Sequence, residues 1–379
     1  MDAVELQLTL GHAGLSARKL RQALESLGVA ATHVSAVESL LGQPATELRR
    51  LGLPRAASAW LAAPDSRRIE AERRWQERQN VALIDCFGTA YPPRLAALGD
   101  APALLYVRGD GSCLGRPQIA MVGTRMPTQT GLRTARQFAA SLVRAGLAIT
   151  SGLAFGIDAA SHHAALVAEG HTVAVVGSGL DQVYPPQHER LAERIVSHGA
   201  LVSELAPGTA PVRWSFPRRN RLISGLSLAT LVVEAAGDSG SLSTARQAIR
   251  QGKPLFAIPS SIHNFQARGC HQLIREGARL VETAADIVRE IAPFLVQKQH
   301  MSAASARDRI TGKSRRLDKG QKILLDALGF EPASIDTLVG RTGFPSQSVA
   351  SMLMMLELAG AVGAEPGGHF VRLFDERHG

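Results

Sequence analysis

The stretch LAITSGLAFGID, residues 147–158, decides the fold of the central part of the chain. It begins with a short apolar run, residues 147–150, and passes directly into a turn rich in glycine and serine. An apolar strand that ends in such a turn and is followed by a helix is the repeating unit of a parallel sheet with helices on both faces. The residues on either side of this stretch repeat the same unit.

Short β-rich runs alternate with helical patterns of about a dozen residues from about Leu104 onward. The expected strands are Leu104–Val107, Ile119–Val122, Leu147–Thr150, Val173–Val176, Ala200–Ser203, Leu228–Glu234 and Leu255–Ile258. Several of these runs are apolar at every position, which indicates a sheet covered on both faces. The alternation predicts an α/β domain with a mostly parallel sheet.

Three further parts flank or follow this α/β domain, which we place at residues 81–296. Residues 1–80 carry Leu and Ala at helical spacing and predict a small helical domain of SAM or helix-hairpin-helix type with a charged connector helix. Residues 297–317 are basic and lack periodicity, so we expect a linker. Residues 318–379 contain three short helical patterns and a hairpin bracketed by glycine, which predicts a winged helix.

The charge of the chain favours a polyanionic partner. Its 42 Lys and Arg residues exceed its 33 Asp and Glu residues by nine, although a protein can be basic without binding nucleic acid or an anionic membrane surface. Residues 318–379 hold five basic against eight acidic residues, so the excess belongs to the body of the chain.

Composition also excludes several classes of protein. No apolar run reaches the ~18–20 residues that a membrane helix needs, and the N-terminus lacks the pattern of a signal peptide. The cysteines Cys86, Cys113 and Cys270 are scattered, with no C-x-x-C pair. We therefore expect a cytoplasmic protein that does not insert into a membrane and has neither a disulfide framework nor a cysteine zinc site.

Four of the expected strands end in corners rich in glycine and hydroxyl groups. These corners contain Gly123, Thr124 and Arg125; Ser151, Gly152 and Gly156; Gly177, Ser178 and Gly179; and Ser239, Gly240 and Ser241. Ligands of open α/β sheets bind beyond the carboxyl ends of the strands, and helix N-termini bind phosphate through unpaired N–H groups. Turn chemistry alone explains one such corner, but four on one edge predict a phosphate-binding site.

The segment VRWSFPRRNR, residues 212–221, interleaves arginine with aromatic residues. Its predicted binding residues are Phe216, Arg218, Arg219, Asn220 and Arg221. Arginine pairs with phosphate oxygens, and aromatic rings stack on exposed bases. The segment thus extends the phosphate site and favours single-stranded nucleic acid over a mononucleotide. The alternative is a solvated arginine face with Trp214 and Phe216 filling the core.

Known enzyme signatures are incomplete in this chain. The Gly312-Lys313-Ser314 run lacks the first glycine of a P-loop. Gln182 stands where a dinucleotide fingerprint has its third glycine, although Glu204 lies where a ribose-binding acid belongs.

Other candidate catalytic or ligating residues also have ordinary explanations. His162 and His163 lack Cys or Asp partners at ligand spacing, so we expect them on a helix surface and expect no metal or cofactor. Asp158 and Glu234 are candidate general bases, but we favour their accepting hydrogen bonds from loop N–H groups or fixing Arg125.

Five motifs in register over about residues 80–285 resemble the DNA-processing protein A (DprA/Smf) family. They are Gly123-Thr124-Arg125, the runs from Ser151 to His162 and from Gly177 to Pro185, and the runs from Phe216 to Leu226 and from Glu234 to Ala245. The resemblance implies a Rossmann-like core between a small helical N-terminal domain and a C-terminal winged helix. It also implies a non-catalytic homodimer that protects incoming single-stranded DNA and loads the recombinase RecA in natural transformation, with Arg125 contacting DNA.

The chain departs from the family pattern at two places. Pro186 stands where relatives often have lysine, so a second cation is either missing or supplied by Arg218 or Arg219. The loop from Pro259 to His271 lacks the Pro-Gly and Gly-[ST]-Asn pattern of relatives, which leaves its role open.

The third helix of the winged part, residues 346–359, contains no Lys or Arg, so we expect this domain to serve protein interaction or regulation. The alternative to a DNA-binding protein is a nucleotide-processing enzyme of phosphoribohydrolase type, in which Arg125, Asp158 and Glu234 cleave an N-glycosidic bond.

Overall fold

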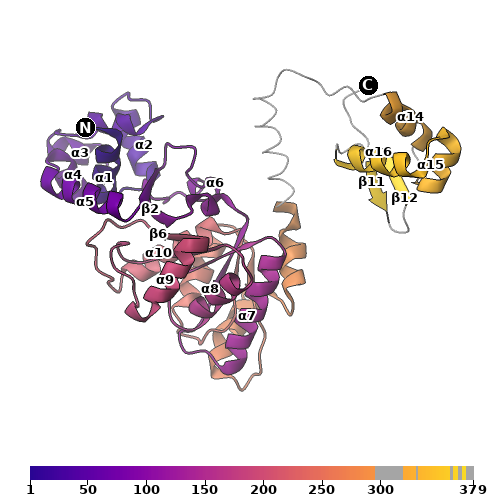
Figure 1. The fold of residues 1–379 in the computed structure, drawn as a ribbon. Helices are drawn as coiled ribbons and strands as arrows, with labels where there is room; N and C mark the ends of the chain where they lie inside the picture. The colour runs from indigo at the N-terminus through magenta and orange to yellow at the C-terminus, as the bar shows by residue number, and fades with distance from the viewer. Residues whose placement is uncertain (295–318, 330–331, 359–361, 366–368, 373–379) are drawn as a thin grey trace. The chain divides into compact units, whose positions relative to one another are not determined.

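The computed structural model of the chain describes residues 1–294, 319–329, 332–358, 362–365 and 369–372 (Figure 1). The chain forms two compact units, Met1–His300 and Met301–Gly379. The linker expected over residues 297–317 lies outside the described residues.

A nine-stranded sheet in the order β1-β2-β6-β5-β4-β3-β7-β8-β9 forms the core of the first unit. Its strands are β1 Val81–Asp85, β2 Leu104–Gly109, β3 Gln118–Val122, β4 Ala148–Ser151, β5 Thr172–Val175, β6 Gly199–Ser203, β7 Ala229–Val232, β8 Leu255–Ala257 and β9 Arg279–Leu280. All neighbours from β6 to β9 pair parallel, whereas β1 and β2 form an antiparallel end. The α/β fold with a mostly parallel sheet is therefore confirmed.

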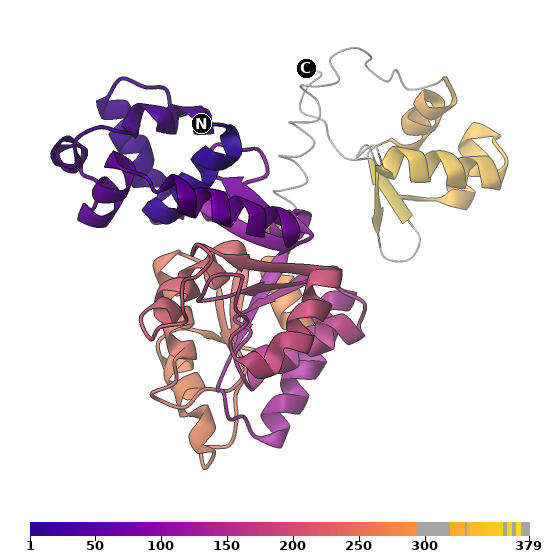
Figure 2. The same cartoon turned by 60° about the vertical axis from the view of Figure 1, so that its left-hand side comes forward.

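Helices cover both faces of this sheet, and Figure 2 shows the strands between the two helical layers. One layer contains α7 Gln129–Arg144, α8 Ile157–Val167, α9 Glu189–His198 and a helix over residues 284–294. The other contains α10 Ser215–Leu226, α11 Ser241–Arg250 and α12 Arg268–Arg275. Alternate residues of the strands point into each layer, as Ile119 and Ala120 of β3 do.

The N-terminal helices pack on the β1–β2 end of the sheet (Figure 1). They are α1 Ala3–Ala13, α2 Ala17–Ser26, α3 Ala45–Arg50, α4 Arg55–Ala62 and α5 Ser66–Arg78, and a single-turn helix, α6 Pro93–Ala96, follows β1. Gln7 Nε2 donates to Asp85 Oδ2 over 2.7 Å, and Trp60 Nε1 donates to the carbonyl of Thr9 over 2.9 Å. Because the helices share one hydrophobic cluster with the strands, they belong to the same compact unit.

The second unit is a winged helix. It contains α14 Lys319–Leu328, α15 Ile335–Thr342 and α16 Ser346–Leu358, with β10 Ala333–Ser334, β11 Val362–Glu365 and β12 His369–Arg372 in an antiparallel sheet of order β10-β12-β11. Leu324, Leu338 and Leu353, one from each helix, are buried in its core. This arrangement confirms the fold expected for residues 318–379.

The direction in which the chain crosses the sheet reverses at β3. From β3 the chain builds β4, β5 and β6 on one side, and it then returns to place β7, β8 and β9 on the other side. Open α/β sheets bind ligands in the crevice that such a reversal leaves beyond the carboxyl ends of the strands. The corners singled out in the sequence follow β5, β4, β3 and β7, which are four adjacent strands.

None of the helices that the structure describes has both the length and the apolar character required to cross a membrane.

Candidate nucleic-acid interface

A cavity of about 700 Å³ lies at the carboxyl ends of β3 and β7. The loop after β3, the first turns of α10 and the start of α11 form most of its wall. The predicted site residues that line it are Gly123, Thr124, Arg125, Phe216, Arg219, Asn220, Ser239, Gly240 and Ser241. The fold thus brings together three motifs that are far apart in the sequence.

Arg125 carries an exposed charge at this cavity. Its guanidinium carbon lies 5.9 Å from the centre of the Phe216 ring, and that ring lies 5.5 Å from the ring of Tyr184. Among the residues that the structure describes, Arg125 forms no ion pair. Within the described part of the chain, this cation therefore has no acidic partner and lies beside an aromatic pair.

The corner after β7 forms the opposite part of the wall. Helix α11 begins at Ser241 without a side-chain cap, so the positive end of its dipole lies at the cavity. The hydroxyl oxygens of Ser239 and Ser241 are 2.7 Å apart, and a Cβ atom on Gly240 would meet nothing within 4 Å. This corner is therefore open at Gly240 and offers hydroxyl groups and the positive end of a helix to an anion.

The corner after β4 is instead filled by groups of the protein itself. The buried carboxylate of Asp158 accepts hydrogen bonds from the backbone N–H groups of Gly152 (3.1 Å) and Ala154 (3.4 Å). Burial raises the pKa of Asp158, while the nearby guanidinium of Arg219 opposes that shift. Ser151 Oγ donates to the carbonyl of Met121 over 2.6 Å. Ser151 and Gly152 accordingly do not line the cavity.

Gly156 also lies off the cavity wall, but it supports the loop that carries Arg125. It adopts a φ of 78°, and a Cβ atom there would collide with the carbonyl oxygen of Thr124 and the backbone of Arg125. Only glycine allows this approach without strain. The glycine expected to approach phosphate instead lets two loops of the protein lie against each other.

Arg219 is buried at the base of the site. Its Nη1 donates to the carbonyls of Gly152 (2.8 Å) and Val175. Burial lowers the pKa of Arg219 to about 10, and the nearby carboxylate of Asp158 favours its charged form. Although Arg219 lines the cavity, its guanidinium is committed to holding α10 against β4 and β5.

Arg218 and Arg221 lie off the cavity wall because both pair with Glu204. Glu204 Oε2 lies 2.6 Å from Nη2 of Arg221 and 3.1 Å from Nη2 of Arg218. This pairing occupies the carboxylate that a dinucleotide site would need for ribose. The exposed cation that shares the cavity with Arg125 is Arg213, whereas the sequence singled out Arg218 and Arg219 as replacements for the missing lysine.

The aromatic residues of this segment are not core plugs. Trp214 is 57% exposed, and Phe216 lines the cavity. The alternative in which Trp214 and Phe216 fill the core behind a solvated arginine face is therefore wrong, since the start of α10 lies at the surface.

The corner after β5 contributes one residue to the cavity wall. That residue belongs to the motif but was not among the predicted binding residues. Gly177, Ser178 and Gly179 do not line the cavity, and Ser178 is buried with its Oγ donating to the carbonyl of Gln182 over 3.1 Å. Tyr184, seven residues after Gly177 in the same motif, does line it. An aromatic residue that follows a strand-end glycine was the signal for this contact.

Glu234 acts as an anchor for two loops. Its carboxylate accepts hydrogen bonds from Thr128 N (2.8 Å), Thr128 Oγ1 (2.9 Å) and Asn264 Nδ2 (3.0 Å). Asn264 belongs to the loop from Pro259 to His271, and Gln266 of that loop lines the cavity. Glu234 therefore fixes the segment that follows Arg125 and not Arg125 itself. The loop from Pro259 to His271, whose role the sequence left open, supports that arrangement.

The two neighbouring histidines have different surroundings. His162 is fully buried on the inner side of α8, its Nδ1 lies 2.7 Å from Thr172 Oγ1, and burial lowers its pKa to about 3. The expected surface position is therefore wrong for His162 and confirmed for His163, which is exposed.

Comparison with known families identifies the chain. The family model described as DNA recombination-mediator protein A matches residues 82–292, and the model of the DprA winged helix domain matches residues 311–368. The chain belongs to the DprA/Smf family. It is 40% identical over 331 residues to Protein Smf of Escherichia coli (strain K12), covering 87% of each chain. It is also 40% identical over 220 residues to DNA processing protein DprA of Bacillus subtilis, covering 58% of this chain and 74% of that relative.

Solved structures of DprA proteins share this fold. The X-ray structure of DNA processing protein A from Streptococcus pneumoniae matches with a TM-score of 0.64 and 34% identity, over 74% of this chain and 95% of that chain. A structure of DNA processing protein A from Helicobacter pylori, described for its single-stranded DNA binding mode, matches with a TM-score of 0.51 and 29% identity, over 56% of this chain and 96% of that chain. The chain is thus a DprA/Smf protein with a Rossmann-like core and a winged helix.

Proposed function

We propose that this DprA/Smf protein binds single-stranded DNA, without chemically changing it, at the cavity beyond the carboxyl ends of β3 and β7. The observation that carries the proposal is the exposed Arg125, which has no ion-pair partner among the described residues and lies beside the ring of Phe216, next to that of Tyr184. A cation next to partly exposed rings fits a strand that offers both a phosphate and an unstacked base. A relative of the same fold, the protein from Helicobacter pylori, is described as binding single-stranded DNA.

The shape of the site favours a single strand over a duplex. Tyr184 is 44% exposed and Phe216 is half-buried, and both rings line the cavity where an unstacked base can reach them, whereas the bases of a duplex are already stacked on each other. Arg125 and Arg213 supply charge on one wall, while Ser239, Gly240 and the start of α11 supply donors on another. These groups fit the sugar–phosphate chain, which is the same for every sequence, so binding has little base preference.

Asp158 and Glu234 act as structural acceptors in this proposal. Each carboxylate already accepts two or more hydrogen bonds from loop groups of the protein. That commitment favours binding over hydrolysis of an N-glycosidic bond. Release of free base from nucleoside monophosphates by the purified protein would overturn the non-catalytic role.

Family membership extends the proposal to partners and process. We expect a cytoplasmic homodimer that protects incoming single-stranded DNA and loads RecA onto it during natural transformation. Light scattering should give twice the mass of the chain. RecA should assemble faster on an oligonucleotide coated with single-strand-binding protein when this protein is present.

The direct test is fluorescence anisotropy with a labelled dT oligonucleotide, the corresponding duplex and a series of salt concentrations. We expect tighter binding to the single strand and a linear fall of log K with log salt. Equal affinity for both DNAs, or affinity that does not change with salt, would contradict the proposal.

The winged helix serves protein interaction or regulation in this proposal. Residues 346–359 supply no Lys or Arg, and residues 318–379 have a net charge of −3 from five basic and eight acidic residues. Such a surface does not neutralise phosphate. Deletion of residues 318–379 should change the affinity for single-stranded DNA by less than about tenfold at fixed salt, and a larger loss would assign DNA binding to this unit.

A further inference from the structure

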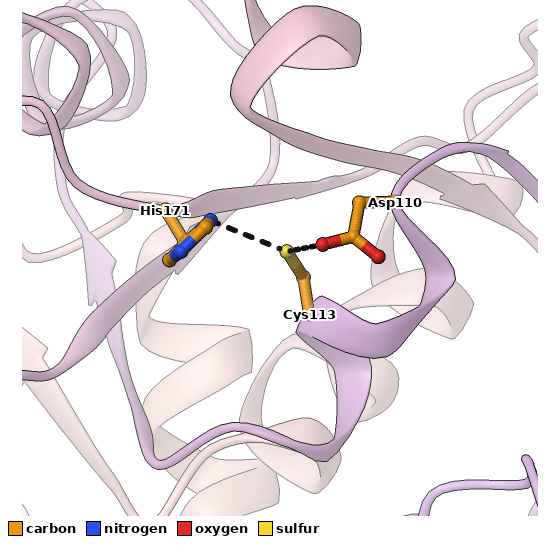
Figure 3. Close-up of side chains that lie close together, drawn as sticks. All are labelled: Asp110, Cys113 and His171. Atoms are coloured by element: carbon orange, nitrogen blue, oxygen red, sulfur yellow. Dashed lines mark hydrogen bonds between the residues drawn. The ribbon is translucent and has the colours of Figure 1, made fainter.

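Three potential metal ligands from two separate segments meet at the end of the sheet opposite the cavity. Asp110, Cys113 and His171 place a carboxylate oxygen, a thiol sulfur and an imidazole nitrogen within 4.8 Å of one another (Figure 3). Cys113 Sγ lies 3.3 Å from Asp110 Oδ2 and 3.5 Å from His171 Nδ1. Sequence spacing hides this cluster, because Cys113 and His171 are 58 residues apart.

The backbone holds all three residues in place. Asp110 caps the short helix η2, Gly111–Gly115, and its N–H donates to the carbonyl of Gly199 over 2.8 Å. Cys113 is buried within η2, and its N–H donates to the carbonyl of Asp110 over 3.1 Å. His171 directly precedes β5, and its carbonyl accepts from Ile149 N over 3.1 Å. The ligand atoms therefore stand on ordered segments at the amino end of β5, whereas the DNA cavity lies beyond the carboxyl ends of the sheet.

We propose that Asp110, Cys113 and His171 form a zinc site that fastens η2 to the start of β5. Bond lengths of about 2.3 Å to sulfur and about 2.0–2.2 Å to nitrogen and oxygen place tetrahedral ligand atoms about 3.3–3.6 Å apart. Edges that include sulfur are about 3.5–3.6 Å long by the same bond lengths. The 3.5 Å from Cys113 Sγ to His171 Nδ1 matches this length, and the 3.3 Å to Asp110 Oδ2 is slightly shorter. Asp110 is exposed, so rotation of its side chain can close the third edge of the tetrahedron.

The mixture of ligands selects the metal. Thiolate and imidazole favour zinc over magnesium or calcium, which take oxygen ligands. Three protein ligands leave a fourth position for water in a four-coordinate zinc site. Binding breaks the S–H bond of Cys113, forms a Zn–S bond and releases the proton to solvent. The ring proton of His171 moves from Nδ1 to Nε2 by exchange with solvent, which breaks the hydrogen bond to the carbonyl of His198, and Nδ1 then coordinates through its lone pair.

The surroundings argue against a reactive or redox-active cysteine. Burial and the neighbouring Asp110 raise the pKa of the Cys113 thiol to about 12, so the free thiol is not a nucleophile at neutral pH. Without metal, the same three groups form hydrogen bonds: the thiol to Asp110, and His171 Nδ1 to the carbonyl of His198 over 3.1 Å. A hydrogen-bonded trio that never takes up metal is the outcome that competes with a zinc site.

The test is titration of the chelator-treated, untagged full chain with Co²⁺, which replaces zinc and reports sulfur ligation by a thiolate-to-metal absorption band. We expect one ion per chain, the absorption band, and displacement of Co²⁺ by Zn²⁺. The band should disappear in Cys113→Ala and weaken in His171→Ala. It should persist in Cys86→Ala and Cys270→Ala, because those buried cysteines lie outside the cluster.

Thermal unfolding with and without Zn²⁺ provides a second measurement of metal binding if a variant folds poorly. Zn²⁺ should raise the unfolding temperature of the wild-type chain and of Cys270→Ala, and it should not raise that of Cys113→Ala or Asp110→Asn. Absence of the absorption band in the folded wild-type chain, or an equal band in folded Cys113→Ala, would overturn the zinc site. Neither result depends on DNA binding.

Discussion

The loop after β3 and the helix α10 border the same cavity, but they use arginine in opposite ways. Arg125 in the loop is exposed, and no ion pair among the described residues neutralises it. Arg219 in α10 is buried and donates to two backbone carbonyls. Both belong to motifs that the sequence marks as DNA-binding. The difference shows that the position of an arginine in the fold, and not its presence in a motif, decides whether its charge is available to a ligand.

The largest expected effect comes from the buried arginine. Arg219→Ala should lower the free energy of unfolding by roughly 3–5 kcal/mol, because it removes the cation beside the buried Asp158 and the donor to two buried carbonyls. Urea unfolding measures this loss. Arg133→Ala is the matched control, since Arg133 is exposed on α7 and should change stability by less than about 0.5 kcal/mol. Equal stability of the two variants would show that the buried Arg219 contributes no more to folding than an exposed arginine does.

The next effect concerns the ring beside Arg125. Phe216→Ala should weaken binding of a dT oligonucleotide by about 1–3 kcal/mol, since one base loses its stacking partner. Trp214→Ala is the control, because Trp214 is exposed but lies off the cavity wall. If anisotropy shows the larger loss for Trp214→Ala, the strand does not stack in this cavity.

Arg125→Ala should weaken single-strand affinity about tenfold while leaving the free energy of unfolding nearly unchanged. Because one phosphate contact is lost, the slope of log K against log salt should fall by about 0.7. Arg133→Ala on α7 should retain both affinity and slope. An unchanged affinity for Arg125→Ala would show that this exposed charge does not contact DNA.

The smallest effect separates the two arginines that share Glu204. Arg218→Ala should change stability by less than about 1 kcal/mol, because its side chain is 39% exposed and solvent screens the pair. Arg221→Ala should cost more, since its side chain is only 8% exposed and lies 2.6 Å from Glu204. Urea unfolding measures the loss of stability in each variant. A larger loss for Arg218→Ala than for Arg221→Ala would contradict the burial assigned to the two side chains.

Much of the fold was predictable because it follows from local patterns. The apolar runs that became β3 to β8 contain little besides buried residues, and the glycine-rich corners mark where β3, β4, β5 and β7 end. Strand β1, in which only three of the five residues are buried, and β9, which consists of two exposed residues, were not predicted from the sequence. Antiparallel pairing of β2 with β6 depends on packing across the sheet, which no local pattern encodes.

The candidate site was harder to predict because sequence shows charge but not burial. Arg219 and Arg221 share a motif with residues on the cavity, yet Arg219 is enclosed by protein groups and Arg221 by its acidic partners. The glycines are similar: Gly240 is open, whereas Gly156 is required for contact between two loops. Arg213 and Tyr184 stood within the quoted motifs, and only the folded chain shows that they line the cavity.

Hydrogen–deuterium exchange of the full chain with and without a dT oligonucleotide tests the location of the strand most directly. We expect slower exchange in residues 123–126 and 236–243 on binding, with no change at η2 or at the start of β5. Protection confined to the second unit, or to the opposite edge of the sheet, would show that the strand binds somewhere other than beside Arg125.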